Sequence, residues 1–292
     1  MNKTAKRLLF ISLGVIALLV TTGAAFNWFM TSRSYDPNYD YLSVLKSSPA
    51  YDYTEKTDVI FSYESKDSAD LTKLRELSAL NAIAGTGTDL EKSQKLLKWV
   101  NELIRHDGSQ PLPAKRDAIS LIEYAQSSGQ GLNCRGLAII LSESLLSVGV
   151  KARFVELLPR DFSSDSHVVT LAYLSELDQW VFLDPTYQAY FVDGTGHYLD
   201  IAEIRSGLIN DSVLQANSAI NYNGGPVDVD YLHYLAKNFY RFASPEYSAF
   251  GIDSSPDRKM ISLNPMGNND GRRNPFSKNQ IIHNPDIFWA KP

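Results

Sequence analysis

The sequence predicts an α+β fold in which several helices pack on one antiparallel sheet. From about residue 70 to residue 148, apolar residues recur every three or four positions, which is the spacing of amphipathic helices. Three runs rich in Val, Phe and Tyr follow between residues 150 and 184, and a short loop joins the last two as in a hairpin. Helices followed by antiparallel strands are typical of α+β domains.

The apolar spacing places the individual helices. We expect helices over residues 70–80, 90–106, 117–126, 135–148, 201–208 and 231–242. Asp70 and Asp200 stand at N-cap positions, and Gly149 follows the fourth helix as a C′ residue commonly does.

The expected strands are the runs "VKARFVEL", "HVVTLAYL" and "QWVFLD", and "SELDQ" is the loop between the last two. A short additional strand is expected at Val59–Tyr63, and a turn at Asp193–Gly196.

Composition divides the chain into four regions. Residues 1–30 form a signal anchor or signal peptide, and residues 31–70, rich in Ser, Tyr and Asp, form a linker outside the cytoplasm. Residues 71–245 form the main domain. Residues 246–292 form a C-terminal extension that is largely loop and contains "NPMGNNDGRRNPF".

The N-terminal region has the features of an export segment. Lys3, Lys6 and Arg7 precede an apolar run, Leu8–Phe26, that is nearly long enough to span a bilayer as an uncleaved anchor. Small residues at positions 22–25 also allow cleavage, and a buried helix of a soluble domain is the third alternative. Both export alternatives place the rest of the chain outside the cytoplasm, because the positive flank stays inside.

Composition argues against several classes of function. The formal net charge is -5, which disfavours electrostatic binding of nucleic acid. The single cysteine excludes an intramolecular disulfide and a Cys-x-x-Cys zinc site. No H-E-x-x-H spacing occurs, so we expect neither a metal nor a cofactor.

That single cysteine, Cys134, stands at the start of the helix expected over residues 135–148. Such a position lowers the pKa of a thiol, and Arg135 adds to this effect if its side chain points inward. A nucleophilic thiol also needs a base and a group that orients the base. His167 begins one strand of the hairpin and Asp184 ends the other, 17 residues later (184 − 167 = 17), so the two side chains can meet.

The segments "NCRGLAIIL", "DSHVV" and "WVFLDPT" resemble the three core motifs of the transglutaminase-like superfamily, over roughly residues 90–208. The resemblance implies a papain-like fold and a catalytic triad of Cys134, His167 and Asp184. Two departures occur: Leu132 stands where many members have Gly, and "HVV" lacks the aromatic residue that often follows the histidine.

An oxyanion hole needs two donors. The backbone N–H of Cys134 is one candidate, and Gln130 is our candidate for the other, with Gln126 and Asn133 as alternatives. His106 lies near the end of a predicted helix and is interpreted as a favourable charge on the helix dipole.

These features lead to a functional hypothesis: an exported or membrane-anchored cysteine enzyme that transfers the acyl group of an amide in a protein or peptide substrate through a thioester. Hydrolysis and transamidation both remain open, and no calcium-loop signature is present. The alternative is a non-catalytic transglutaminase-like scaffold protein of the cell envelope.

Overall fold

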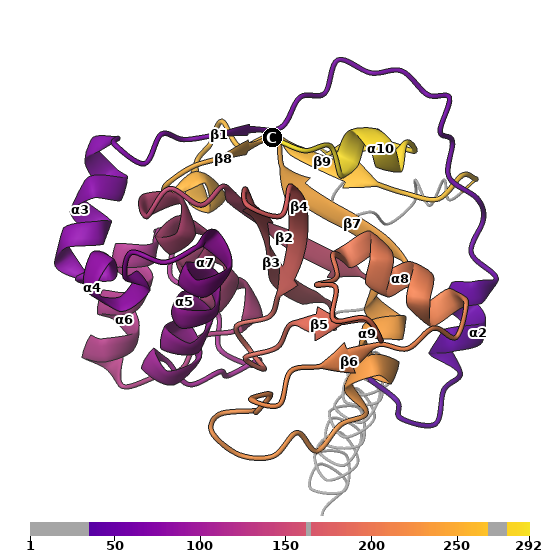
Figure 1. Cartoon of the computed structure of the whole chain (residues 1–292), viewed down its shortest axis with the longest axis horizontal. Coiled ribbons are helices and arrows are strands. Elements are labelled where there is room, and N and C mark those ends of the chain that lie inside the picture. The colour runs from indigo at the N-terminus through magenta and orange to yellow at the C-terminus, as the bar shows by residue number, and fades with distance from the viewer. Residues whose placement is uncertain (1–34, 162–164, 268–278) are drawn as a thin grey trace, which may run out of the picture. The chain divides into compact units, whose positions relative to one another are not determined.

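The computed structural model of the 292-residue chain describes residues 35–161, 165–267 and 279–292. From Pro37 onward these residues, apart from Asp165, form one compact unit. Helices lie on both sides of a central sheet of six strands (Figure 1), so the predicted α+β class is confirmed.

The described part of the chain contains the following elements. The helices are α2 (Tyr41–Lys46), α3 (Ala69–Leu77), α4 (Leu80–Ala84), α5 (Asp89–Leu103), α6 (Ala118–Ser128), α7 (Cys134–Ser147), α8 (Ile201–Ile209), α9 (Tyr231–Asn238), the 3₁₀ turn η1 (Ile252–Ser254) and α10 (Pro285–Phe288). The strands are β1 (Ser62–Tyr63), β2 (Ala152–Leu158), β3 (His167–Leu174), β4 (Gln179–Leu183), β5 (Phe191–Val192), β6 (Gln215–Ala216), β7 (Arg241–Pro245), β8 (Tyr247–Ser248), β9 (Met260–Leu263) and β10 (Gln280–Ile282).

The central sheet has the order β10-β9-β7-β2-β3-β4. The three strands predicted between residues 150 and 184 are β2, β3 and β4, which lie side by side and antiparallel. β7 and β9 continue the antiparallel pairing, but β10 runs parallel to β9. The sheet is therefore mixed at one edge rather than wholly antiparallel.

Two apolar cores lie against the two faces of this sheet. Successive side chains of a strand point to opposite faces. Phe154 of β2 and Ala172 of β3 therefore join the core beneath α3–α7, while Val155 and Leu171 join the core beneath α2, α8, α9 and α10. Figure 1 shows these two groups of helices on opposite sides of the strands.

The end of the helix predicted over residues 231–242 is wrong. α9 ends at Asn238, and Arg241 begins β7. Apolar residues at 231, 235, 239 and 242 fit a helical period, yet Phe242 pairs with Leu157 on one side and Leu263 on the other. These strand pairings outweigh the local helical pattern. The spacing of apolar residues could not indicate them, because both partners of Phe242 lie outside residues 231–242.

The regions expected to flank the main domain are built into it. Leu45 of α2 is buried and α2 packs against α9, while β1 pairs with β8. Residues 246–292 contain much loop, as expected, but they also supply β9 and β10 of the central sheet. The boundaries expected near residues 70 and 245 therefore do not separate independent bodies.

A buried arginine ties the C-terminal helix to the sheet. The side chain of Arg153 in β2 is almost wholly buried, and its Nη2 donates a hydrogen bond of 2.5 Å to the main-chain oxygen of Phe288. Its guanidinium lies 4.0 Å from the ring centroid of Phe61 and 5.0 Å from that of Phe288. The Nε and Nη1 atoms have no hydrogen-bond partner among the described residues, and the aromatic rings around the guanidinium stabilise its charge through cation–π contacts.

The predicted signal or anchor at residues 1–30 lies outside the described residues. Among the helices that the structure does describe, none combines the length and the apolar character needed to cross a bilayer.

The role of α10 predicts the effect of one substitution. Phe288 is fully buried, so Phe288→Ala should lower the free energy of unfolding by about 3–5 kcal/mol, measured by urea denaturation. Ile281→Ala in β10 is the control, because Ile281 is 42% exposed and its loss should change stability by less than about 0.5 kcal/mol. Equal small effects at both positions would mean that the C-terminal segment is dispensable.

Candidate active site

Cys134 is the first residue of α7, and Asn133 caps this helix. The Oδ1 atom of Asn133 accepts a hydrogen bond from the N–H of Gly136 (3.2 Å), and its Nδ2 donates to the main-chain oxygen of Gln110 (3.0 Å). The cap fixes the direction of the helix and leaves the thiol at its positive end. The side chain of Asn133 thus joins the start of α7 to the main chain of Gln110.

The segment before Cys134 is held by a short backbone pairing. The N–H of Leu132 donates to the oxygen of Arg105 (3.1 Å), and the N–H of Asp107 donates to the oxygen of Leu132 (2.8 Å). A Cβ atom on Gly131 would lie 2.4 Å from that oxygen of Arg105, so this close approach requires glycine. The pairing brings His106 beside the residue two positions before Cys134.

Helix α7 is anchored to the strand that carries His167. Thr170 Oγ1 of β3 donates to the main-chain oxygen of Ala138, one turn into α7, over 3.1 Å. His167 is the first residue of β3, and its imidazole interacts with the thiol of Cys134 and lowers the pKa of that thiol. The structure therefore brings together the cysteine and histidine that the sequence suggested.

Asp184 holds the other side of this imidazole. The Nε2 atom of His167 lies 2.6 Å from Oδ2 of Asp184, and both side chains are buried. Thr170 pairs with Leu183 in the register of β3 and β4. One residue further, Asp184 leaves the same face of the sheet as His167, which explains their contact. Since Asp184 takes Nε2, the Nδ1 atom of His167 is left for the thiol.

Three further groups fix the carboxylate of Asp184. Its Oδ1 accepts from the N–H of Thr186 (2.9 Å), and its Oδ2 accepts from the hydroxyl of Tyr231 in α9 (2.6 Å). Asn101 of α5 donates through Nδ2 to the main-chain oxygens of Pro185 and Thr186. The Asp-Pro-Thr turn is thus held from both sides, and sequence reasoning identified neither Asn101 nor Tyr231.

Electrostatics at this site favour a thiolate and an imidazolium. Burial raises the pKa of Cys134, but hydrogen bonds and charge interactions with His106 and His167 outweigh it and lower the pKa to about 6. Burial lowers the pKa of His167, but Asp184 and Cys134 raise it to about 10. Burial likewise opposes ionisation of Asp184, yet the charge of His167 and the hydrogen bonds to the carboxylate lower its pKa. Between these values the thiol is ionised and the imidazole is protonated.

Aromatic rings surround His167 although the motif "HVV" lacks one. Tyr187 and Tyr234 both meet the imidazole edge-on, with ring centroids 6.0 Å and 5.5 Å away. Tyr187 follows the Asp-Pro-Thr turn, and Tyr234 comes from α9. Distant parts of the chain therefore supply the cover that a neighbouring aromatic residue would otherwise give.

His106 also interacts with the thiol and lowers its pKa, which sequence analysis did not foresee. The Nδ1 atom of His106 lies 3.0 Å from the hydroxyl of Tyr222. The helix expected to end at His106 ends at Leu103 instead. No local pattern shows that the chain after α5 returns to pair with Leu132, so the sequence carried no signal for this contact.

Arg135 follows Cys134 but faces other partners. It donates through Nη2 to Oε1 of Glu156 (2.6 Å) and through Nη1 to Oδ1 of Asp253 (2.9 Å). Asp253 also binds Arg116 and Arg258. Arg135 therefore joins α7 to β2 and η1, and its charge also interacts with that of the Cys134 thiolate.

Gln130 lies on an exposed loop. Its Oε1 accepts hydrogen bonds from Nε2 of Gln110 (2.6 Å) and from the hydroxyl of Tyr124 (2.8 Å). Gln126 is exposed on α6. The oxyanion role suggested for Gln130 stays a prediction.

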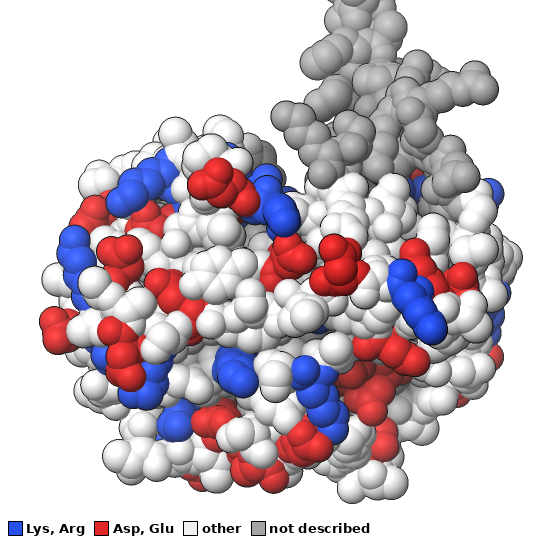
Figure 2. Space-filling model, turned by 90° about the horizontal axis from the view of Figure 1, so that it is seen from above, with Lys and Arg blue, Asp and Glu red and all other residues white. Residues whose placement is uncertain are grey.

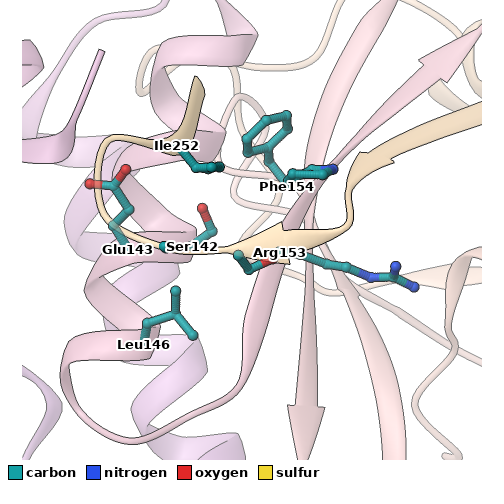
Figure 3. A pocket seen from close by; sticks show the side chains of 9 residues that line it. Ser142, Glu143, Leu146, Arg153, Phe154 and Ile252 are labelled. Carbon is teal, nitrogen blue, oxygen red and sulfur yellow. The ribbon is translucent and has the colours of Figure 1, made fainter. Parts of the chain in front are cut away.

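A buried acid on α7, Glu143, lines a small cavity between α7 and the segment after β7 (Figure 3). Burial raises its pKa well above the usual value. Its two oxygens accept from the N–H groups of Ala118 (2.7 Å) and Gly251 (2.9 Å), so the side chain joins two segments of backbone. Cys134 is not among the residues that line this cavity.

Within the described residues, no three His, Cys, Asp or Glu side chains gather as a metal ion would require.

Residues 78–185 match the transglutaminase-like superfamily, and the match includes Cys134, His167 and Asp184. The resemblance stated from the sequence motifs is thus confirmed over this segment. No curated protein matches the chain.

Several solved structures are similar to parts of the chain. A candidate protease from Parabacteroides distasonis shares 14% identity, with 44% of this chain and 30% of that chain covered and a TM-score of 0.28. A candidate cysteine protease from Cytophaga hutchinsonii shares 15% identity, with 56% and 55% covered and a TM-score of 0.31. The transglutaminase of red sea bream shares 14% identity, with 70% and 38% covered and a TM-score of 0.33. The chain thus spans 30% to 55% of the length of these proteins.

The lowered pKa of Cys134 predicts how its reactivity depends on pH. Only the thiolate is alkylated, so the rate with iodoacetamide should rise through a midpoint near pH 6 and be nearly complete at pH 7. His167→Ala should move the midpoint upward, because the variant loses a hydrogen bond and a positive charge beside the sulfur. A wild-type midpoint above about pH 8, the range of a free thiol, would contradict the ion pair.

Proposed function

We propose that this chain is a cysteine-dependent acyl-transfer enzyme that acts on amide bonds outside the cytoplasm. The observation that supports this most is the arrangement of Cys134, His167 and Asp184. The thiol begins a buried helix and contacts the histidine, and the histidine contacts a buried aspartate. A nucleophile, a base and an orienting group in this order are the requirements for acyl transfer through a covalent intermediate.

The first half of the reaction forms a thioester. The sulfur of Cys134 attacks the carbonyl carbon of the amide, and the carbonyl oxygen becomes an oxyanion. As the tetrahedral intermediate collapses, His167 gives its proton to the amide nitrogen, the C–N bond breaks and the amine leaves. The backbone N–H of Cys134 lies at the free start of α7 and is one donor to the oxyanion.

The second half releases the acyl group. His167, now neutral, takes a proton from water or from an acceptor amine, whose oxygen or nitrogen attacks the thioester carbon. The C–S bond then breaks and the thiolate returns. Water gives hydrolysis and an amine gives transamidation. We propose hydrolysis of a protein or peptide amide as the main outcome.

Asp184 acts through His167 in this scheme. Its carboxylate keeps the proton on Nε2, so that Nδ1 faces the sulfur and exchanges the reacting proton. Tyr231 and the N–H of Thr186 satisfy the remaining lone pairs of the carboxylate, so it stays ionised although it is buried.

The charge on the surface bears on the choice of substrate. On the face drawn in Figure 2, described Lys and Arg side chains lie interspersed with Asp and Glu side chains. Such a face gives no strong field of one sign, which fits a polypeptide substrate better than a polyanion.

Activity on a protein substrate tests this function. With fluorescent casein and dansylcadaverine as probes, wild type should release peptides or incorporate the amine, and Cys134→Ala should reduce both to background. Asp184→Asn should lower kcat by about 10²–10⁴ without unfolding the protein, because it loses control of the His167 tautomer. Asp228→Asn, at an exposed site, is the control. Equal activity in wild type and Cys134→Ala would rule out the mechanism.

The location outside the cytoplasm is a proposal that stands on Lys3, Lys6, Arg7 and the apolar run that follows them. A membrane-impermeant maleimide added to intact cells, with any outer membrane permeabilised, should therefore label Cys134. A Cys134→Ala strain is the control for labelling of other proteins. If labelling requires lysis of the inner membrane, the domain lies inside.

A further inference from the structure

A second imidazole, that of His106, interacts with the thiol of Cys134 in addition to His167. The main chain of His106 forms a parallel bridge with Leu132, two residues before the cysteine. Helix α5 ends at Leu103, and the short segment after it pairs with the residues that lead into α7. The side chain of His106 is half-buried, and its interaction with the thiol of Cys134 lowers the pKa of that thiol.

One loop, residues 217–225, fixes both the backbone and the ring of His106. Asn223 accepts through Oδ1 from the N–H of His106 (2.7 Å) and donates through Nδ2 to its oxygen (3.2 Å), as a neighbouring strand would. Asn223 adopts a left-handed backbone conformation, with φ of 53°, which asparagine tolerates better than most residues. Its neighbour Tyr222 meets the imidazole ring at 5.5 Å between centroids and reaches Nδ1 with its hydroxyl.

The same loop is tied to the surroundings of His167. The N–H of Asn221 donates to the main-chain oxygen of Tyr187 (2.9 Å), and the Tyr187 ring contacts both His167 and Tyr222. The loop that contacts His106 is therefore linked through Tyr187 to the ring of His167.

The contact with Tyr222 decides which nitrogen of His106 carries the proton. A phenol is a good donor, and when its O–H donates to Nδ1, a neutral imidazole must carry its proton on Nε2. Nε2 is the nitrogen left for the thiol, so in this tautomer His106 offers an N–H donor to the reacting centre. This is the form that a developing oxyanion needs, because the donor is in place before charge appears.

From this geometry we propose that His106 is a catalytic residue that donates Nε2–H to the sulfur of Cys134 and then to the oxyanion, and that Tyr222 positions it by fixing its tautomer. This inference rests on the proposed acyl transfer and gives it a second oxyanion donor.

Two reactions of the same thiolate distinguish stabilisation of the oxyanion by His106 from an effect of His106 on ionisation of the thiol. p-Nitrophenyl acetate acylates Cys134: the S–C bond forms, an oxyanion appears on the carbonyl oxygen, and the C–O bond then breaks to release nitrophenolate. Iodoacetamide alkylates the same sulfur and displaces iodide without forming an oxyanion. Both rates are proportional to the thiolate fraction, so that fraction cancels in their ratio at one pH.

The experiment measures the ratio of acylation to alkylation in purified variants of the full chain. His106→Ala should lower the ratio by about 100-fold, as expected for loss of one oxyanion donor. His106→Gln should lose less, because its amide still offers a donor. Tyr222→Phe keeps the ring and should lower the ratio by about fivefold, because the tautomer is no longer fixed. His197→Ala and Tyr53→Phe are controls at exposed sites and should leave the ratio unchanged.

The possible outcomes are distinguishable. If folded wild type neither releases nitrophenolate nor reacts with iodoacetamide, the proposed function itself fails. If wild type reacts but the ratio stays within twofold in His106→Ala and Tyr222→Phe, the function stands and the role of His106 is overturned. If His106→Ala does not fold, Tyr222→Phe decides the question alone. Parallel losses of both rates would also overturn the role, because they would show an effect on thiolate formation only.

Discussion

The hydrogen bond between His167 and Asp184 is the constraint around which this half of the molecule is arranged. Both side chains are buried, and a buried charge is tolerated only when it is paired and its other hydrogen-bonding sites are filled. Tyr231 from α9 and Asn101 from α5 meet these needs directly or through the Asp-Pro-Thr turn. Helices on both faces of the sheet must therefore be docked before the pair is stable.

The centre of the sheet connects this pair to the nucleophile. Thr170, three residues after His167, hydrogen-bonds α7 one turn after Cys134, so the separation of thiol and imidazole depends on one strand and one helix. Arg135 then joins the same helix to Glu156 on β2 and to Asp253 after β8. The thiol thus sits on a helix that is fixed at several points, which is the rigidity that positioned catalysis requires.

Patterns in the sequence predicted those parts of the structure that depend on residues close together in the chain. The motifs around Cys134, His167 and Asp184 lie on a capped helix and one hairpin, so spacing alone could bring them together. His106 and Tyr222 meet through a loop 116 residues away, and no period or motif records such a contact. The same reason explains β7, where pairing with distant strands replaced a helical pattern. The sequence also could not show in which direction a side chain points. Arg135, for example, points to the carboxylates of Glu156 and Asp253.

The position of α10 has a consequence for the order in which the molecule can assemble during synthesis. The ribosome has made all three proposed site residues once it reaches Asp184, yet Phe288 follows 104 residues later (288 − 184 = 104). Arg153 keeps its charge throughout, since a guanidinium does not deprotonate in proteins. Until α10 arrives, that charge lacks its carbonyl partner and much of its aromatic cover. A nascent chain therefore contains Cys134, His167 and Asp184 before it contains Tyr231, which binds Asp184, and before α10 covers Arg153 in the central strand β2.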